Sequence, residues 1–105
     1  MSMIENLQAM LARGQDTALL RFGLGQAYYK DNNFFHAVQH LLIAVEHDEN
    51  NSAAWKMLGK TQVELNELDE AKQAFTRGIE VAEANGDVQA VKEMQVFLKR
   101  IKKGE

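Results

Sequence analysis

The chain has 105 residues, of which 46% are hydrophobic and 26% charged, and it contains no cysteine and no proline. This composition is that of one small globular domain and not of a disordered chain. The absence of cysteine excludes disulfides, zinc–thiolate sites and cysteine nucleophiles. A net charge of −3 provides no overall field that would attract nucleic acid or an anionic membrane, so neither is predicted as a partner.

Targeting and membrane signals are missing from the sequence. The first ten residues, MSMIENLQAM, lack the basic region followed by an apolar run that marks a secretory signal. No apolar run approaches the roughly 20 residues that a membrane-spanning helix requires. We therefore predict a cytoplasmic protein. Strand signals are missing too, since no β-branched alternation is bounded by turn residues, so the chain is predicted to be all-α.

Apolar residues at helical spacing, together with caps and turn residues, predict about six helices. The first opens with Ser2 and Glu5 at the spacing of a capping box, and Gly14 follows it as a left-handed cap. Ser52 and Asp87 are expected to be the N-caps of the fourth and sixth helices. The second helix is expected to follow a cap at Asp16 or Thr17 and to end at about residue 30. The other expected ranges are 2–12, 34–47, 53–65, 68–84 and 87–103.

A shift of 34 residues superposes two consecutive helix pairs of the chain. The dipeptide Leu24-Gly25 then falls on Leu58-Gly59, and each unit is a helix, a tight turn and a second helix. The other superposed pairs are Asn32 and Asn66, Ala37 and Ala71, Leu41 and Phe75, Ala44 and Gly78, and, as a weaker match, Tyr28 and Gln62.

This pattern resembles the tetratricopeptide repeat family. The residues that carry the resemblance are Trp55, Leu58, Gly59, Ala71, Phe75 and Gly78, with Leu24, Gly25, Tyr28, Ala37, Leu41 and Ala44 as their counterparts. It implies a right-handed α-α superhelix in one domain, 1–105. Its expected parts are a half-repeat helix over 2–13, repeats over 18–51 and 52–85, and a capping helix over 87–103, since the register fails after Gly86. Arg21 departs from the pattern, because it stands where Trp55 supplies a bulky apolar residue.

Two glycines interrupt the second predicted helix, although glycine costs about 1 kcal/mol there relative to alanine. Gly25 and its counterpart Gly59 are expected to let the two helices of a repeat pack closely, which is the general logic of stacked repeats. Gly23 has Met57 as its counterpart and permits two interpretations. It either makes room for a neighbouring helix or lets a bound peptide approach the backbone.

The family resemblance implies that the first helices of the repeats line a concave groove. Lys56 and Lys60 share one helix face, and this pair of lysines favours a peptide with an acidic group or a terminal carboxylate. A solvated lysine face is the alternative. The expected lining residues are Phe22, Gly23, Gln26, Tyr29 and Lys30 from repeat one and Ala53, Lys56, Lys60, Val63 and Glu64 from repeat two.

The sequence thus predicts a non-enzymatic interaction module that binds a peptide or helix of a partner protein, without a cofactor. His36 and His40, at i and i+4 on a stripe that also carries His47, are weak candidates for a metal site, because cysteine is absent and neither Glu46 nor Asp48 falls clearly on that stripe. The alternative function is self-association, as a homodimer or assembly, through apolar terminal helices. The residues that suggest it are Met3, Ile4, Met10, Val96 and Phe97.

Overall fold

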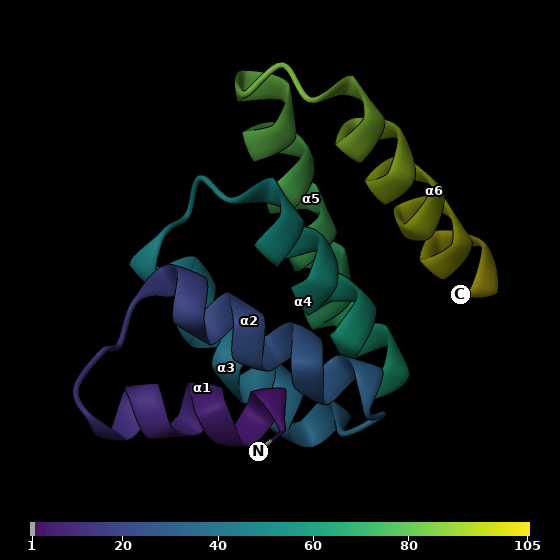
Figure 1. The fold of residues 1–105 in the computed structure, drawn as a ribbon. Coiled ribbons are helices and arrows are strands. Elements are labelled where there is room, and N and C mark those ends of the chain that lie inside the picture. Colours follow the sequence, from purple (N-terminus) through teal and green to yellow (C-terminus); the bar gives the residue numbers. More distant parts are fainter. Residues whose placement is uncertain (1) are drawn as a thin grey trace.

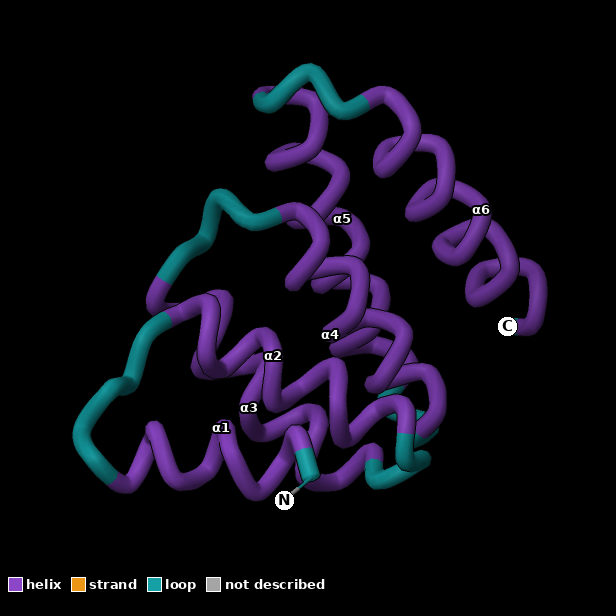
Figure 2. Tube along the Cα trace, viewed as in Figure 1, coloured by secondary structure: helices purple, strands orange, loops and turns teal. Residues whose placement is uncertain are grey.

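Short turns join six α-helices in the computed structural model, which describes residues 2–105 (Figure 2). Within that range all regular secondary structure is helical, so the predicted all-α class is confirmed. No helix of the described range is both long enough and apolar enough to cross a bilayer. The helices are α1 (Met3–Ala12), α2 (Ala18–Lys30), α3 (Phe34–His47), α4 (Ser52–Glu64), α5 (Leu68–Ala84) and α6 (Val88–Gly104).

The helices stack as successive hairpins. Helix α2 packs mainly on α3, and α4 packs mainly on α5, so each expected repeat is one helical hairpin (Figure 1). Helix α1 packs on α2 at one end of the stack, while α6 packs on α5 and also contacts α4 at the other end. The first helices of the two hairpins, α2 and α4, contact each other directly. The side chains of α2, α4 and α6 are thereby brought onto one shared surface.

Side chains of the residues before each helix explain most of the helix starts. Ser2 forms the predicted capping box with Glu5, and the Thr17 hydroxyl accepts a hydrogen bond from Leu20 N at 3.1 Å. The prediction for Ser52 is wrong, because α4 begins at Ser52 and Asn51 is its N-cap. The side-chain oxygen Oδ1 of Asn51 accepts a hydrogen bond from the backbone N of residue 54 at 3.1 Å, and asparagine caps a helix as well as serine does.

The backbone of the turns repeats with the same period as the sequence. Asn32 and Asn66, which lie 34 residues apart, both adopt the left-handed conformation, with φ of 60° and 58°. Gly14 and Gly86 adopt it after α1 and α5, with φ of 87° and 73°. Asparagine and glycine tolerate this conformation better than other residues, so these positions end the helices sharply.

Close packing inside each hairpin accounts for two of the glycines. A Cβ atom placed on Gly25 would lie 2.5 Å from Cγ and Cδ2 of Leu41, and one placed on Gly59 would lie 2.6 Å from Cε1 of Phe75. Leu41 and Phe75 are fully buried, so neither can move away from an added methyl group. The predicted role of both glycines is confirmed.

Candidate functional site

Two adjoining hollows lie on the surface that α2, α4 and α6 share. The larger, of about 510 Å³, is lined from α1, α2, the turn after α2, and α4, and the smaller, of about 90 Å³, from α2, α4 and α6. Tyr29 lines both hollows, and we call the two together the Tyr29 groove. Its residues are Met3, Gln26, Ala27, Tyr29, Lys30, Asn32 and Met57 in the larger hollow and Tyr29, Lys60, Val63, Glu64 and Phe97 in the smaller one.

Most of the lining residues predicted from the sequence meet in this groove. Gln26, Tyr29 and Lys30 line the larger hollow, because Tyr29 and Lys30 lie one helical turn after Gln26 on α2. Lys60, Val63 and Glu64 line the smaller hollow for the same reason on α4. The spacing of these residues along two helices that contact each other is what brings them to one surface.

Four predicted residues do not line the groove. Phe22 is partly buried against the core that α2, α3 and α4 share, and Ala53 is exposed at the start of α4. A Cβ atom on Gly23 would lie 3.5 Å from Cδ1 of Leu7, so Gly23 faces α1, which favours the interpretation that it makes room for a helix. Lys56 Nζ lies 3.3 Å from a carboxylate oxygen of Glu93 in α6, so this lysine has an acidic partner that same-helix spacing does not reveal.

Aromatic rings hold the remaining lysine of the predicted pair in place. The Lys60 ammonium lies 5.3 Å from the ring centroid of Tyr29 and 5.8 Å from that of Phe97, within the range of cation–π attraction. The Phe97 ring stacks on buried Phe75 with a centroid distance of 5.3 Å. Burial raises the pKa of the Tyr29 phenol, and the Glu64 carboxylate raises it further, so the hydroxyl is protonated at neutral pH.

The charges of the groove are mainly positive. Lys30 and Lys60 bring two cations, and Glu64 brings one carboxylate. Neither lysine takes part in an ion pair among residues 2–105. The apolar wall is supplied by Met3, Met57 and the aromatic rings. The groove therefore offers hydrogen-bond donors to an anionic group beside an apolar contact surface.

Sequence reasoning missed five groove residues, namely Met3, Ala27, Asn32, Met57 and Phe97. Phe97 stands 34 residues after Val63, so extending the repeat register into the last helix would have pointed to it. The sequence argues against that extension, because the large and small residues typical of the family do not recur after Gly86. Met57 is the counterpart of Gly23, and a methionine at an irregular surface position is an adaptable apolar contact.

The histidines of α3 bind neighbours within the chain. The ring of Tyr28 stacks on His36 and His40, with centroid distances of 5.1 and 5.5 Å. His36 Nδ1 lies 2.9 Å from the Asn33 side-chain oxygen, and His40 Nδ1 lies 3.1 Å from a nitrogen of Arg21. Burial lowers the pKa of His40, and the charge of Arg21 lowers it further. Among residues 2–105 there is no group of three or more His, Cys, Asp or Glu arranged to hold a metal ion.

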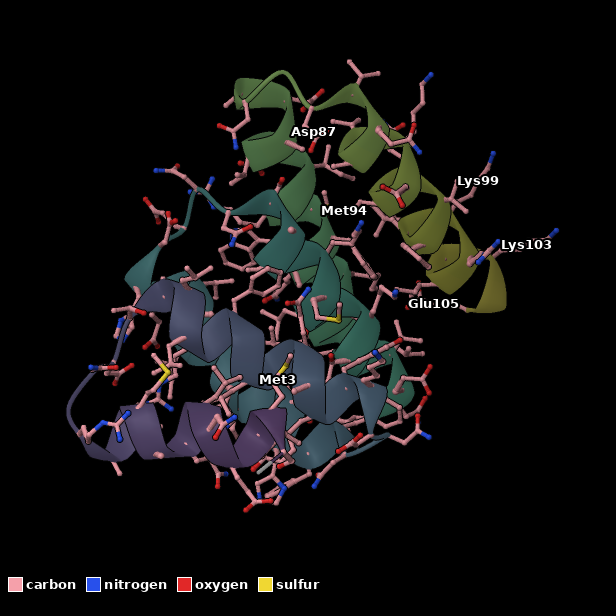
Figure 3. All side chains as sticks on the ribbon, in the orientation of Figure 1. Met3, Asp87, Met94, Lys99, Lys103 and Glu105 are labelled. Atoms are coloured by element: carbon pink, nitrogen blue, oxygen red, sulfur yellow. The ribbon has the colours of Figure 1, made fainter. Side chains whose placement is uncertain are left out.

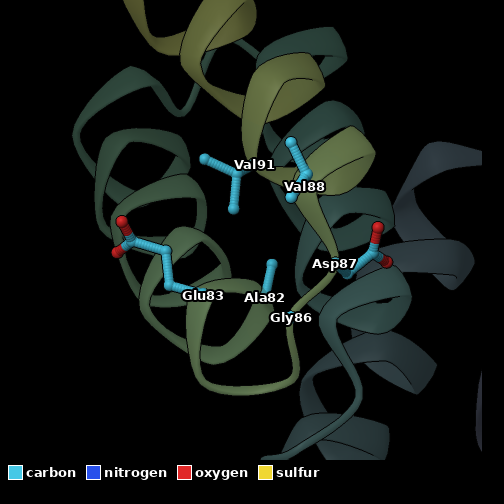
Figure 4. A pocket seen from close by; sticks show the side chains of 6 residues that line it. All are labelled: Ala82, Glu83, Gly86, Asp87, Val88 and Val91. Carbon is cyan, nitrogen blue, oxygen red and sulfur yellow. The ribbon is translucent and has the colours of Figure 1, made fainter.

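A further hollow, of about 240 Å³, lies at the turn between α5 and α6, away from the Tyr29 groove. The methyl groups of Ala82, Val88 and Val91 face it from the two helices (Figure 4). The Asp87 carboxylate at its edge accepts a hydrogen bond from the backbone N of residue 90 at 3.1 Å and thereby caps α6, as predicted. Capping and helix packing account for these residues.

Comparisons with known proteins agree with the geometry, although no family model matches the chain. A TPR repeat-containing protein of Pseudomonas aeruginosa is 48% identical over 99 residues, which cover 94% of each chain. The solution structure of a Bordetella parapertussis protein has a TM-score of 0.84 and 43% identity, over 99% of this chain and 90% of that one. The first TPR of Spaghetti, bound to an HSP90 peptide, has a TM-score of 0.77 and 22% identity, over 96% of this chain and 75% of that one, which supports the fold alone. The chain belongs to the tetratricopeptide repeat family, whose helix pairs wind into a right-handed α-α superhelix.

Proposed function

We propose that the chain is a non-enzymatic interaction module that binds a peptide or helix of a partner protein in the Tyr29 groove. Proteins built from such repeats use extended concave surfaces for binding. The observation that carries the proposal is that residues chosen by their position in two separate repeats line adjoining hollows that share Tyr29. The cytoplasm stays the predicted compartment, since a sequence without cysteine fits a reducing environment.

The chemistry of the groove defines the partner segment. Lys30 and Lys60 fit a carboxylate, from an acidic side chain or a chain terminus, and charged hydrogen bonds of this kind are among the strong ones. Met3, Met57 and Phe97 fit an apolar side chain next to that carboxylate. Lys56 is left out of the proposal, because Glu93 neutralises it within the chain.

Peptide affinity measured by fluorescence anisotropy tests this proposal. Binders would be selected from a random peptide library with free C-termini, and the peptide SRMEEVD, which Spaghetti binds, would be included because it joins a methionine to acidic side chains. We expect selected peptides to be acidic and to lose at least about tenfold in affinity with Lys30→Glu or Lys60→Glu, which corresponds to about 1.4 kcal/mol.

Lys99→Glu is the matched control, because Lys99 extends from α6 away from the body of the molecule (Figure 3). This variant makes the same charge change outside the groove, so peptide affinity should stay within about twofold of the wild type. A selection that returns no binder would contradict the proposal. Binders that lose as much affinity with Lys99→Glu as with Lys60→Glu would also contradict it, since the attraction would then come from net charge.

Self-association through the last helix is the second candidate. Val88 and Val96 are 63% and 47% exposed on α6, which is more apolar exposure than packing on α5 requires. Of the residues that suggested it from the sequence, Met3 is 68% exposed on α1 but lines the Tyr29 groove, and Phe97 stacks on Phe75. Light scattering on the wild type and on Val96→Glu tests it, and a dimer that the substitution dissolves would support it.

A further inference from the structure

The two repeats differ in how they fill one equivalent place. In repeat two this place lies on the side of α4 away from the Tyr29 groove. In repeat one this place is filled by Tyr28, which is only 8% exposed. Its ring stacks on His36 and His40 of α3, and its hydroxyl accepts a hydrogen bond from the side-chain amide Nε2 of Gln8 in α1. Repeat one therefore holds a phenol ring between helices, with a glutamine amide on its hydroxyl.

In repeat two, other residue types stand at the same positions. Thirty-four residues further on, Gln62 replaces Tyr28, Leu42 replaces Gln8, Ala74 replaces His40, and Glu70 replaces His36. The structure has a hollow of about 350 Å³ there, which opens between α3 and α5 and is lined in part by Glu70. We call it the Gln62 cavity; residues that line it include Leu42, Trp55, Leu58, Gln62, Ala74 and Arg77. It shares no lining residue with the Tyr29 groove.

Gln62 has a polar atom that the rest of the described chain does not satisfy. Its side chain lines the cavity and is only 4% exposed, and its Oε1 atom is buried without a hydrogen-bond partner. Buried amide oxygens are nearly always paired, so this one requires a partner, and a donor from outside the chain can supply it. Rotation of the amide about its last bond can present either the oxygen or the nitrogen to the cavity.

We propose that the Gln62 cavity binds the side chain of a tyrosine from a partner protein. The ring would lie against Leu42, Trp55 and Leu58, and the hydroxyl would meet the Gln62 amide. Repeat one carries the argument for this occupant, because there a tyrosine ring fills the equivalent place and its hydroxyl pairs with a glutamine amide. In repeat two the two positions are exchanged in kind: the glutamine, Gln62, stands where Tyr28 stands, and the ring would come from the partner. Size agrees, since a cavity of about 150 Å³ already takes benzene. Leu42 is 45% exposed, so a side chain can reach the cavity from solvent.

Fluorescence of Trp55 gives a direct test, because Trp55 lines the cavity and is the single tryptophan of the chain. N-acetyl-tyrosinamide and N-acetyl-phenylalaninamide would be titrated with excitation selective for tryptophan. We expect a saturable change with the tyrosine compound and binding at least about tenfold weaker with the phenylalanine compound, since a buried amide left unpaired disfavours the ligand without the hydroxyl. Equal binding of the two compounds would overturn the proposal.

A third probe, p-cresol, separates a partner's side chain from a free phenol. If p-cresol binds and N-acetyl-tyrosinamide does not, the cavity has no room for the backbone of a partner, and the proposal fails. NMR chemical shifts then locate the compound. Changes at the side-chain amide of Gln62 are expected, whereas changes confined to the Tyr29 groove would place the ring at the other site and refute the assignment.

Variants of the cavity complete the test. Leu42→Gln combined with Gln62→Tyr gives repeat two the pair that repeat one already has, so it should fill the cavity, raise the Tm and abolish the Trp55 response. Ala74→Leu, which narrows the cavity from α5, should also abolish the response and serves if the double variant does not fold. Gln95→Tyr, at an exposed position of α6, should leave it unchanged. A response that persists in both folded cavity variants would contradict the proposal.

Discussion

Gly23 and Gly25 lie two residues apart in α2 and should respond in opposite directions to replacement by alanine. At Gly25 the added Cβ would lie 2.5 Å from Cγ and Cδ2 of Leu41, and only a change of χ1 could move Cγ away, which the full burial of Leu41 prevents. Overpacking of a core costs about 1–3 kcal/mol, and a clash with the branch carbon of a fully buried leucine belongs at the upper end. The better helix propensity of alanine returns about 1 kcal/mol. We expect Gly25→Ala to lower the free energy of unfolding by about 2 kcal/mol.

At Gly23 the balance is reversed. The added Cβ would lie 3.5 Å from Cδ1 of Leu7, which is an ordinary contact distance, so only the helix-propensity gain of about 1 kcal/mol remains. For a domain of this size, about 1 kcal/mol shifts the Tm by roughly 4–8 °C. Gly23→Ala should therefore raise the Tm by roughly 4–8 °C, and Gly25→Ala should lower it by about twice as much. Peptide affinity should not change with Gly23→Ala, because Gly23 faces α1.

Thermal and urea unfolding followed by circular dichroism measure both effects. A double-mutant cycle with Leu41→Ala adds a control for the mechanism, since removing the leucine side chain removes the clash. In that background Gly25→Ala should become neutral or stabilising. The reasoning is refuted if Gly25→Ala raises the Tm as Gly23→Ala does, or if its effect is the same with and without Leu41.

Three further predictions concern charge and packing. The Asp16 carboxylate accepts hydrogen bonds from Arg21 that lower its pKa from 3.8 to about 2. Because the folded-state pKa is the lower one, stability should be lost as pH falls from about 4 to 2. The Asp16→Asn variant should flatten this part of a Tm–pH profile. Gly59→Ala should lower the Tm, because its Cβ would lie 2.6 Å from Phe75, and an unchanged Tm in a calorimetric scan would contradict the packing. Lys56→Met should change the free energy of unfolding by less than about 1 kcal/mol and leave peptide affinity unaltered, since its ion pair is partly exposed; a large loss of affinity would show that this lysine binds the partner after all.

The fold could be predicted from the sequence because its determinants are local and repeated. Apolar spacing, the capping box of Ser2 and the left-handed turn residues each act over a few neighbouring positions. The 34-residue shift then identified Gly25 and Gly59 as positions of close packing. The one wrong cap, Ser52, adjoins Asn51, and both residue types cap helices well. The division into 2–13, 18–51, 52–85 and 87–103 stays a prediction.

The candidate site could be predicted only as far as helical spacing reaches. Spacing tells which residues share a face, so Gln26, Tyr29 and Lys30 were found together. It does not tell which neighbour covers that face. The packing of α6 on α4 and α5 brings Glu93 to Lys56 and Phe97 to Lys60, and both contacts depend on where a helix more than 30 residues away comes to lie. The same limit applies to the Gln62 cavity, which appears only when three helices are assembled.

The measurement that tests the central claim most directly is an NMR titration of the ¹⁵N-labelled protein with a selected acidic peptide. If the Tyr29 groove is the binding surface, the amide shifts that change most should belong to residues 26–32, residues 57–64 and Phe97. The Lys60→Glu variant should reduce these changes at equal peptide concentration. Shift changes that gather instead on α3 and α5, or on the outer face of α6 around Val96, would contradict the account and place the interaction surface elsewhere on the repeat stack.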